Sequence, residues 1–474
     1  MGRLHAFCSR VRDRLRRPVR RRRQAGIALI VATVAIALLT ALAAELFYST
    51  RLEVQMASNA ENELRAHYFA ESAVQLGQAA VVIQQMIDRF SSQIGMAGMI
   101  RVEELIDLLM PMFNQREGGG MLGSLLGVDA SQIKGLGVEG GTFDLKVAFE
   151  DGKLNLNCVG GLDQVTDTPQ KKAVGAILLG LFSSSRYRTL FERMDADGQY
   201  HTPLELAQAM VDWIDVDELG FMTGGPEDYR YDARKDRYVA RNYFADTPQE
   251  TRMVRGMNDD MWASFGEYLT AYGPCRINLT AVNPDHWPLV EGIIRAFAAP
   301  DDPNARDERK LEALAQYVTP MLPYLGQSGG TGTGGTGGTG SSGGTGSSGG
   351  SGGSGGAAGG AAGGVVDAFT QLVQNPTQGA GMLSQGQDGT QMQIEGVKLQ
   401  ASDANTGLNL NTVIGGGKKV IFRLEATGES GPGCLDPKRG TCSRKRITAI
   451  WNSSKMGMNS LQAKQGLWVY WREE

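Results

Sequence analysis

Hydrophobic and polar residues divide the chain into segments of different pattern. Residues 27–44 form an uncharged run rich in Ala, Leu, Ile and Val, which is about the minimum length for a membrane-spanning helix. Residues 51–90 contain no proline and keep apolar side chains mostly at three- and four-residue steps, as one buried helical face requires. The pattern predicts one helix over residues 27–90 that begins in lipid. A membrane-anchored coiled coil is the alternative, but a strict heptad is not sustained.

The remaining chain divides into helix-like and strand-like regions. Strand-like alternation predicts three strands at residues 420–426, 446–451 and 467–471. Residues 161–325 are rich in helical patterns, and residues 326–364 are almost wholly Gly, Ser, Thr and Ala. Such a composition buries too little apolar surface to offset ordering, so it predicts a flexible tether.

Positive charge is concentrated before the apolar run. Residues 1–26 carry ten arginines and one acid, Asp13, for a charge of +9, and since the chain as a whole has a net charge of −4, the rest is −13. The positive-inside rule places residues 1–26 in the cytoplasm and the body outside it. An acidic body repels phosphates, so nucleic-acid binding is disfavoured.

Two ordinary explanations compete for this N-terminal segment. A cleaved secretory signal needs small residues after its apolar core, which Ala41–Ala44 could supply. An uncleaved signal anchor is equally compatible with the arginines and the apolar run. A third interpretation depends on the residues after the apolar run.

Cysteine usage fits an exported protein. After Cys8 in the leader, four cysteines remain, an even number that permits three pairings. Cys434 and Cys442 lie in a Gly/Pro/Lys-rich turn, which suits a disulfide-closed loop. No CxxC motif or nearby histidine supports zinc binding.

Acidic residues cluster most densely between residues 212 and 232. The cluster comprises Asp212, Asp215, Asp217, Glu218, Glu227, Asp228 and Asp232. Closely spaced carboxylates on a loop are ligands that Ca²⁺ prefers, because it takes six to eight oxygens in irregular geometry. The spacing is not that of an EF-hand, so a solvated acidic loop after a helix remains the alternative.

Catalytic motifs do not stand out in the sequence. After the leader only His67, His201 and His286 remain; none lies in an HExxH motif, and GxSxG and P-loop motifs do not occur. We predict no enzymatic activity. A membrane-anchored hydrolase that uses scattered carboxylates is left open.

The N-terminal junction RRRRQAGIALIVATVAIALL resembles a type III prepilin signal, in which a basic leader ends at a glycine and an apolar helix begins at once. The resemblance places cleavage between Gly26 and Ile27. In most of that family the fifth mature residue is glutamate, whereas this chain has Val31. A carboxylate at that depth is costly unless it is partnered, and a subunit at the fibre tip has no neighbour above it to supply a partner.

Four further segments resemble the general secretion pathway protein K family, minor pseudopilins of type II secretion systems. They are FEDGKLNLN at 149–157, the acidic segment at 206–231, residues 240–257 with 272–284, and the paired strands at 420–430 and 445–451. The resemblance implies an α+β, type IV pilin-like fold with a long N-terminal transmembrane helix, a split antiparallel sheet and an inserted all-helical domain. The first strand of the split sheet would lie near residues 143–156, and the remaining strands would follow Met392.

The same resemblance implies a domain order along the chain. The expected parts are a basic prepilin leader (1–26), the N-terminal helix (27–90), a first part of the head (91–160), the inserted helical domain (161–325), a Gly/Ser/Thr-rich flexible linker (326–391) and C-terminal strands that complete the head (392–474).

The resemblance also implies partners and a cofactor. A prepilin peptidase would cut after Gly26 and methylate Ile27, and the protein would join other minor pseudopilins in the inner membrane with its body in the periplasm. Neither nucleic acid nor a small-molecule substrate is expected. A structural Ca²⁺ would be held by Asp215, Asp217, Glu227 and Asp228, with Asp212 at the helix end. The alternatives are a minor pilin of a type IV pilus, and a membrane-anchored periplasmic enzyme or binding module.

Overall fold

The structure is a computed structural model. It describes residues 25–93, 106, 141–160, 168–194, 198–227, 231, 238–325, 359–376, 394–403, 407–435, 438, 440–454 and 466–474. The predicted leader before residue 25, most of residues 94–140 and the Gly-rich residues 326–358 lie outside this part of the chain. Two compact units are present, residues 1–65 with 430–443, and residues 66–429 with 444–474.

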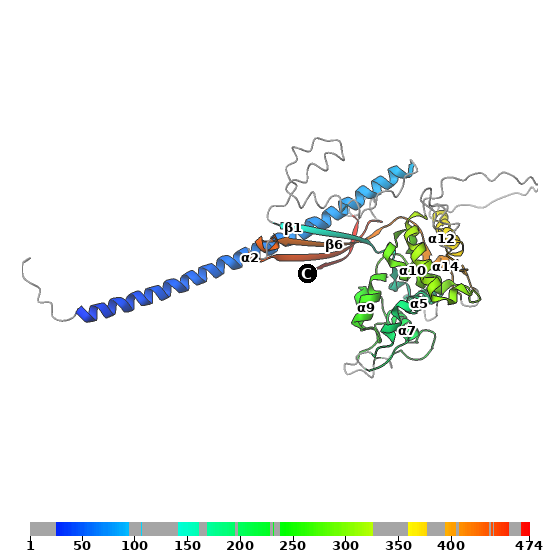
Figure 1. Ribbon diagram of the computed structural model, residues 1–474, viewed down its shortest axis with the longest axis horizontal. Helices are drawn as coiled ribbons and strands as arrows, with labels where there is room; N and C mark the ends of the chain where they lie inside the picture. Colours follow the sequence, from blue (N-terminus) through cyan, green and yellow to red (C-terminus); the bar gives the residue numbers. More distant parts are fainter. Residues whose placement is uncertain are drawn as a thin grey trace, which may run out of the picture. The chain divides into compact units, whose positions relative to one another are not determined.

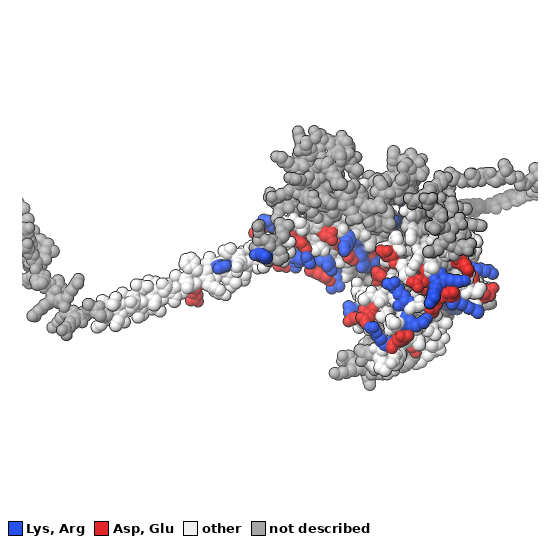
Figure 2. Space-filling view, in the orientation of Figure 1, with Lys and Arg blue, Asp and Glu red and all other residues white. Residues whose placement is uncertain are grey.

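The first element is one helix, α2, which runs from Ala25 to Gln93 over 69 residues. Within the described residues it is the one helix long and apolar enough to cross a membrane, over Ile27–Gln84. Large apolar side chains in its first part are exposed, such as Leu38 and Phe47, and this part is almost without charge (Figure 2). Apolar surface of this extent is stable in lipid or against other helices.

A four-stranded sheet comes next, in the order β1-β6-β7-β8 (Figure 1). The strands are β1 (Gly141–Phe149), β6 (Ile421–Ser430), β7 (Ser443–Asn452) and β8 (Leu467–Glu473). β7 and β8 are antiparallel, with a bulge between Ile450 and Trp451. Small residues let α2 approach the sheet closely, because a Cβ atom on Gly428 would lie 2.0 Å from the carbonyl oxygen of Ala66.

Two neighbouring strands of this sheet, β1 and β6, come from distant parts of the sequence. β1 ends and β6 begins at the same place, since the amide of Glu150 donates to the carbonyl oxygen of Ile421 at 3.0 Å. Asp151 fixes the joint further, because its Oδ2 accepts hydrogen bonds from the amides of Val420 (2.6 Å) and Ile421 (2.8 Å). The described residues between Asp151 and Val420 therefore form an insertion, and the two ends of this insertion lie next to each other at the sheet.

Replacing Asp151 tests this joint. We expect Asp151→Ala to lower the free energy of unfolding by about 2–4 kcal/mol, because two buried amides lose a charged acceptor. Asp151→Asn keeps one carbonyl acceptor and is expected to lose less. Urea unfolding of the detergent-solubilised protein, monitored by tryptophan fluorescence, measures both. Equal stability of Asp151→Ala and the parent protein would contradict the assignment.

The insertion is mainly helical. Its described α-helices are α5 (Pro169–Phe182), α6 (Arg188–Phe191), α7 (Pro203–Ile214), α9 (Asp259–Phe265), α10 (Trp287–Phe297), α11 (Glu308–Val318), α12 (Gly359–Gln374) and α14 (Leu410–Val413). The sequence marks several starts, since Thr168, Thr202, Asn258 and Asp307 cap helices with their side chains. Thr202 and Glu205 form a capping box.

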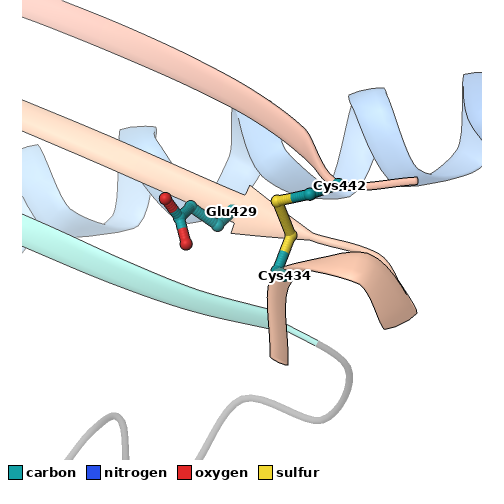
Figure 3. Close-up of side chains that lie close together, drawn as sticks. All are labelled: Glu429, Cys434 and Cys442. Carbon is teal, nitrogen blue, oxygen red and sulfur yellow. A yellow bond between two sulfur atoms is a disulfide. The ribbon is translucent and has the colours of Figure 1, made fainter. Parts of the chain in front are cut away.

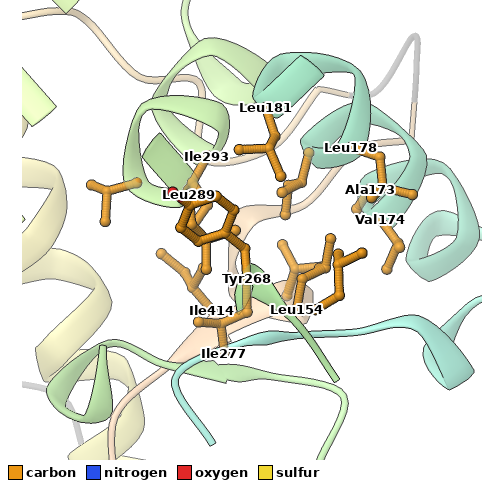
Figure 4. Packing of buried hydrophobic residues seen from close by; sticks show 14 of the residues in the cluster. Leu154, Ala173, Val174, Leu178, Leu181, Tyr268, Ile277, Leu289, Ile293 and Ile414 are labelled. Atoms are coloured by element: carbon orange, nitrogen blue, oxygen red, sulfur yellow. The ribbon is translucent and has the colours of Figure 1, made fainter. Parts of the chain in front are cut away.

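One apolar core holds these helices together. α5 packs against α7 and α10, and the centre contains Leu178, Leu181, Leu289, Ile293 and Tyr268 (Figure 4). Two short parallel pairs also contribute to this core. They are β2 (Leu154–Asn155) with β3 (Leu269–Thr270), and β4 (Ile277–Asn278) with β5 (Ile414–Gly415).

These observations confirm the α+β class with an N-terminal apolar helix and a split sheet, and they correct details. The prediction of a flexible linker over residues 326–391 is wrong for α12, because Val365, Val366, Phe369, Leu372 and Val373 form one buried helical face.

The predicted ends of two further parts also need correction. The strand predicted over residues 143–156 ends at Phe149, and the chain turns at residues 150–152. Gly152 passes close to another segment there, since a Cβ atom on it would lie 2.3 Å from the carbonyl oxygen of Ala281. Residues of the predicted first part of the head (Leu154, Leu156) and of the predicted C-terminal strands (Leu410, Ile414) lie in the core of the helical insertion instead.

Candidate metal-binding site and disulfides

Three buried carboxylates lie together where α7 ends. Asp212 is in the last turn of α7, Asp215 caps it, and Glu227 comes from the loop after it. One oxygen of each lies within 4.8 Å of the others, although the side chains are separated by up to fifteen positions in sequence. Each residue is at most 2% exposed. Carboxylate oxygens are the type of ligand that a divalent cation such as Ca²⁺ takes, and this cluster offers three residues that carry them.

A tight turn brings Glu227 to this position. The amide of Gly220 donates to the carbonyl oxygen of Gly225 at 2.6 Å, and Leu219 and Pro226 form an isolated bridge. Met222 at the tip has φ of 63°, a left-handed conformation that is uncommon for a residue with a side chain. The Asp212 carboxylate holds the base of the turn, because its Oδ1 accepts from the amide of Phe221 at 2.6 Å.

Burial disfavours the charged forms of the carboxylates at this site when no cation is bound. Burial raises the pKa of Asp215 to about 7, although Lys171 beside it acts in the opposite direction. Burial and then the charge of Asp215 raise the pKa of Glu227 to about 9. Among the described residues, Oδ1 of Asp215 and both carboxylate oxygens of Glu227 have no hydrogen-bond partner. Buried oxygens of this kind call for a cation or protons.

Lys171 also lies at this site, which the sequence analysis did not predict. It lies in the first turn of α5 and is 3% exposed. Its Nζ is 2.5 Å from Asp215 Oδ2 and 3.1 Å from Asp217 Oδ2. A lysine near a proline at a helix start is usually a solvated residue, so no pattern in the sequence pointed to it. One ammonium group offsets one of four nearby carboxylates, which leaves a net negative site.

The structure brings two of the four predicted Ca²⁺ ligands together. Asp215 and Glu227 lie in the cluster, and Asp212, which the sequence places at the helix end, supplies an oxygen as well. Asp217 is directed to Lys171, and its Oδ1 accepts from the amide of Leu219 at 2.9 Å. Asp228, like Asp232, lies outside the described residues, so the predicted set of Asp215, Asp217, Glu227 and Asp228 stays a prediction.

Two disulfides are present. Cys434 and Cys442 close the loop between β6 and β7 (Figure 3), so neither sulfur is available as a thiolate ligand. Cys158 and Cys275 form the other bridge, across 117 positions. The even number of cysteines was the available signal for this second pair, but the sequence left its pairing open.

The predicted processing residues lie at the start of α2. The helix includes Gly26 and Ile27 near its N-terminal end, and the side chain of Val31 is exposed. Cleavage between Gly26 and Ile27 stays a prediction, because the residues before Ala25 lie outside the described part of the chain.

Comparisons with known proteins point to one family. A family model described as "Type II secretion system (T2SS), protein K" matches residues 152–274. The type II secretion system protein K of Aeromonas hydrophila is 20% identical over 283 residues, which cover 59% of this chain and 74% of that protein.

A solved structure is also similar in part. It is the crystal structure of the GspK-GspI-GspJ complex from the enterotoxigenic Escherichia coli type 2 secretion system. The matched chain is 14% identical, with a TM-score of 0.39, over 71% of this chain and 81% of that one.

The family-model match spans the segment that carries the carboxylate cluster and nearly coincides with the loop closed by Cys158 and Cys275. The similarity to the Aeromonas hydrophila protein covers more of the chain than this segment. In sequence, the chain is thus similar to protein K of type II secretion systems.

Proposed function

We propose that this chain is a minor pseudopilin that occupies the tip of the type II secretion pseudopilus, where it supports initiation of the fibre and thereby protein export across the outer membrane. The observation that carries the proposal is the continuity of α2. This helix contains the prepilin-like junction at Gly26, and its later part packs on the sheet through residues such as Ala70 and Ala73. A helix of this kind serves as membrane anchor before assembly and as fibre element after it.

The tip position is supported by the insertion and by Val31. A helical domain attached to one end of the sheet adds bulk that a tight helical fibre has no room for between stacked subunits. Val31 stands where a buried carboxylate would need a partner on a neighbouring subunit. Both features suit a subunit that has neighbours on one side alone.

Other minor pseudopilins are the proposed partners. The E. coli structure contains GspK in complex with GspI and GspJ, and the exposed apolar surface of α2 is suited to contact with similar helices. We further propose a single-pass inner-membrane anchor, a periplasmic body and processing by a prepilin peptidase at Gly26, with methylation of Ile27. The role is one of assembly, without catalysis.

A structural Ca²⁺ at the carboxylate cluster completes the proposal. Asp212, Asp215 and Glu227 would supply oxygens to it, and the unpartnered buried oxygens of Asp215 and Glu227 support this. The ion would replace the protons that burial otherwise imposes. By joining the end of α7 to the loop around Met222, it would hold that part of the insertion rigid.

Processing at Gly26 tests the proposal directly. We expect the protein extracted from membranes to begin at N-methylated Ile27, and Gly26→Asp to retain the arginine-rich leader and to abolish export of folded enzymes. Intact-mass spectrometry and a secretion assay measure the two effects. Ala28→Ser, two positions later, serves as the matched control. A mature protein that keeps residues 1–26, or begins near Glu45, would contradict the pseudopilin proposal.

A minor pilin of a type IV pilus shares the same processing. Loss of adhesion or twitching with normal enzyme export, in cells that lack this protein, would favour that alternative. Blocked export with normal pili would favour the secretion role.

A further inference from the structure

The fourth strand of the sheet is left outside its core. The core between α2 and the sheet takes residues from β1, β6 and β7, among them Leu145, Leu424 and Trp451. No residue of β8 belongs to this core within the described part of the chain. Exposure along β8 is correspondingly high, at 50% for Leu467, 37% for Trp468, 43% for Val469 and 39% for Trp471. Contiguous apolar surface of this kind marks an interaction site.

The two tryptophans of β8 face the same side as α2. Trp468 lies opposite Trp451 in the register, with ring centroids 6.4 Å apart, and Trp451 is buried against α2. Trp471 lies 5.1 Å from Trp468 between ring centroids, and its Nε1 donates to Glu473 Oε1 at 2.8 Å. Glu473 in turn pairs with His67 of α2 at 3.6 Å. The other face of β8 is occupied, since Tyr470 packs on Tyr272 of the insertion.

The dimensions of the sheet leave room for a second helix on this face. Four strands at about 4.8 Å spacing place the outer strands about 14 Å apart. Packed helices lie about 8–10 Å apart, so α2 alone covers part of that width. The uncovered part is bordered by His67 and Tyr68 on α2 and by Trp468 and Trp471 on β8; Tyr68 is 56% exposed.

Strand addition at the free edge of β8 is less well supported than helix docking. Edges that resist pairing carry charges and bulges, and β8 ends in Arg472 and Glu473 and has a register shift at Ile450/Trp451. The apolar side chains project from the face of the strand, where a helix packs, and large aromatic side chains are typical anchors of interfaces.

We propose that the face of β8 marked by Trp468 and Trp471 docks the N-terminal helix of a second pilin-like subunit, parallel to α2. The inference rests on the proposed function, because a subunit anchored in the same membrane would present such a helix beside α2. The occupant is an apolar helix, since α2, the element already seated on this sheet face, contacts it through Ala70, Ala73 and Val74.

Site-specific photocrosslinking in cells tests the docking. The full-length protein carries p-benzoylphenylalanine in place of Trp471, Leu39 or Tyr324 in three separate strains. Leu39 lies in the exposed apolar part of α2, and Tyr324, 47% exposed, lies in the helical insertion as the matched control. Mass spectrometry of the crosslinked peptides identifies the partner and the segment captured.

We expect the Trp471 probe to capture the N-terminal helix of another subunit that has a prepilin-type leader, and the Tyr324 probe to capture no such helix. Trp468→Ala should lower the yield at position 471 about tenfold, as loss of an aromatic anchor does. Its own unfolding midpoint should stay near that of the parent, since Trp468 is outside the core.

Two results overturn the inference and are distinguishable. If the Leu39 probe captures another pilin-like subunit but the Trp471 probe captures none, or captures a strand or an exported protein, the docking face is wrong while the proposed function stands. If neither probe captures a pilin-like subunit, the proposed function fails together with the docking.

Discussion

Removal of calcium is expected to lower the melting temperature of the helical insertion by about 5–10 °C. An ion present at about 100 times its dissociation constant stabilises the folded state by about 2.7 kcal/mol, and each kcal/mol corresponds to about 2–4 °C for a domain of this size. The physical reason is the carboxylate cluster, in which Oδ1 of Asp215 and both carboxylate oxygens of Glu227 have no hydrogen-bond partner among the described residues. Differential scanning calorimetry of the solubilised protein with Ca²⁺ or with a chelator measures the shift.

A variant separates the site from general effects of calcium. Glu227→Gln is nearly isosteric with the protonated acid, so we expect it to leave the melting temperature in chelator unchanged while the calcium increment is lost. Asp260→Asn is the matched control, because Asp260 is exposed and pairs with Arg193 away from the cluster. A full calcium increment in Glu227→Gln would show that the ion does not bind at this cluster.

The same site predicts the pH dependence without calcium. The pKa of Glu227 in the folded state is raised to about 9 from its ordinary value of 4.5, so the folded state binds a proton that the unfolded state releases. This stabilisation is complete below pH 4.5 and is lost as the pH rises towards 9. The calcium increment should therefore be larger at about pH 8 than at about pH 6, as calorimetry at the two values will show.

Loss of the Cys158–Cys275 disulfide is expected to lower the free energy of unfolding by about 5 kcal/mol. The bridge closes a loop across 117 positions, and the entropy that such a loop removes from the unfolded chain grows with its length. The helical insertion is the part affected, because the loop contains α5, α7 and the carboxylate cluster. Chemical denaturation of Cys158→Ser/Cys275→Ser under non-reducing conditions measures the effect.

The second disulfide provides an internal comparison. Cys434 and Cys442 are 8 positions apart, for which the same relation gives about 2.5 kcal/mol. Cys434→Ser/Cys442→Ser should therefore cost about half as much. Equal losses from the two double variants would mean that loop length does not determine their contributions.

Much of the fold can be predicted from the sequence where one local signal dominates. The long proline-free run predicts α2, because apolar residues at three- and four-residue steps fall on one face of a helix. Alternating residues located β6, β7 and β8 to within a few positions, because one face of each strand is buried or aromatic. The closely spaced acidic residues around Trp213 predicted the position of the carboxylate cluster.

Sequence-based prediction failed for a short helix next to a stretch of biased composition, and for contacts between residues that lie far apart in the sequence. α12 comes after a Gly-rich stretch, yet Val365, Phe369 and Leu372 keep helical spacing and are buried. Lys171 reaches Asp215 through the packing of α5 on α7, which no local pattern encodes. The short parallel pairs and the Cys158–Cys275 bridge likewise depend on tertiary contacts between distant segments.

The joint at Asp151 and Val420 has a consequence for how such a protein could arise. Because the chain leaves β1 and re-enters β6 at neighbouring backbone positions, these two strands of the sheet are arranged like a hairpin with a domain in place of its loop. A short turn between these two positions would allow the same strand pairing. A domain can therefore be inserted at this joint without a change to the sheet or to α2.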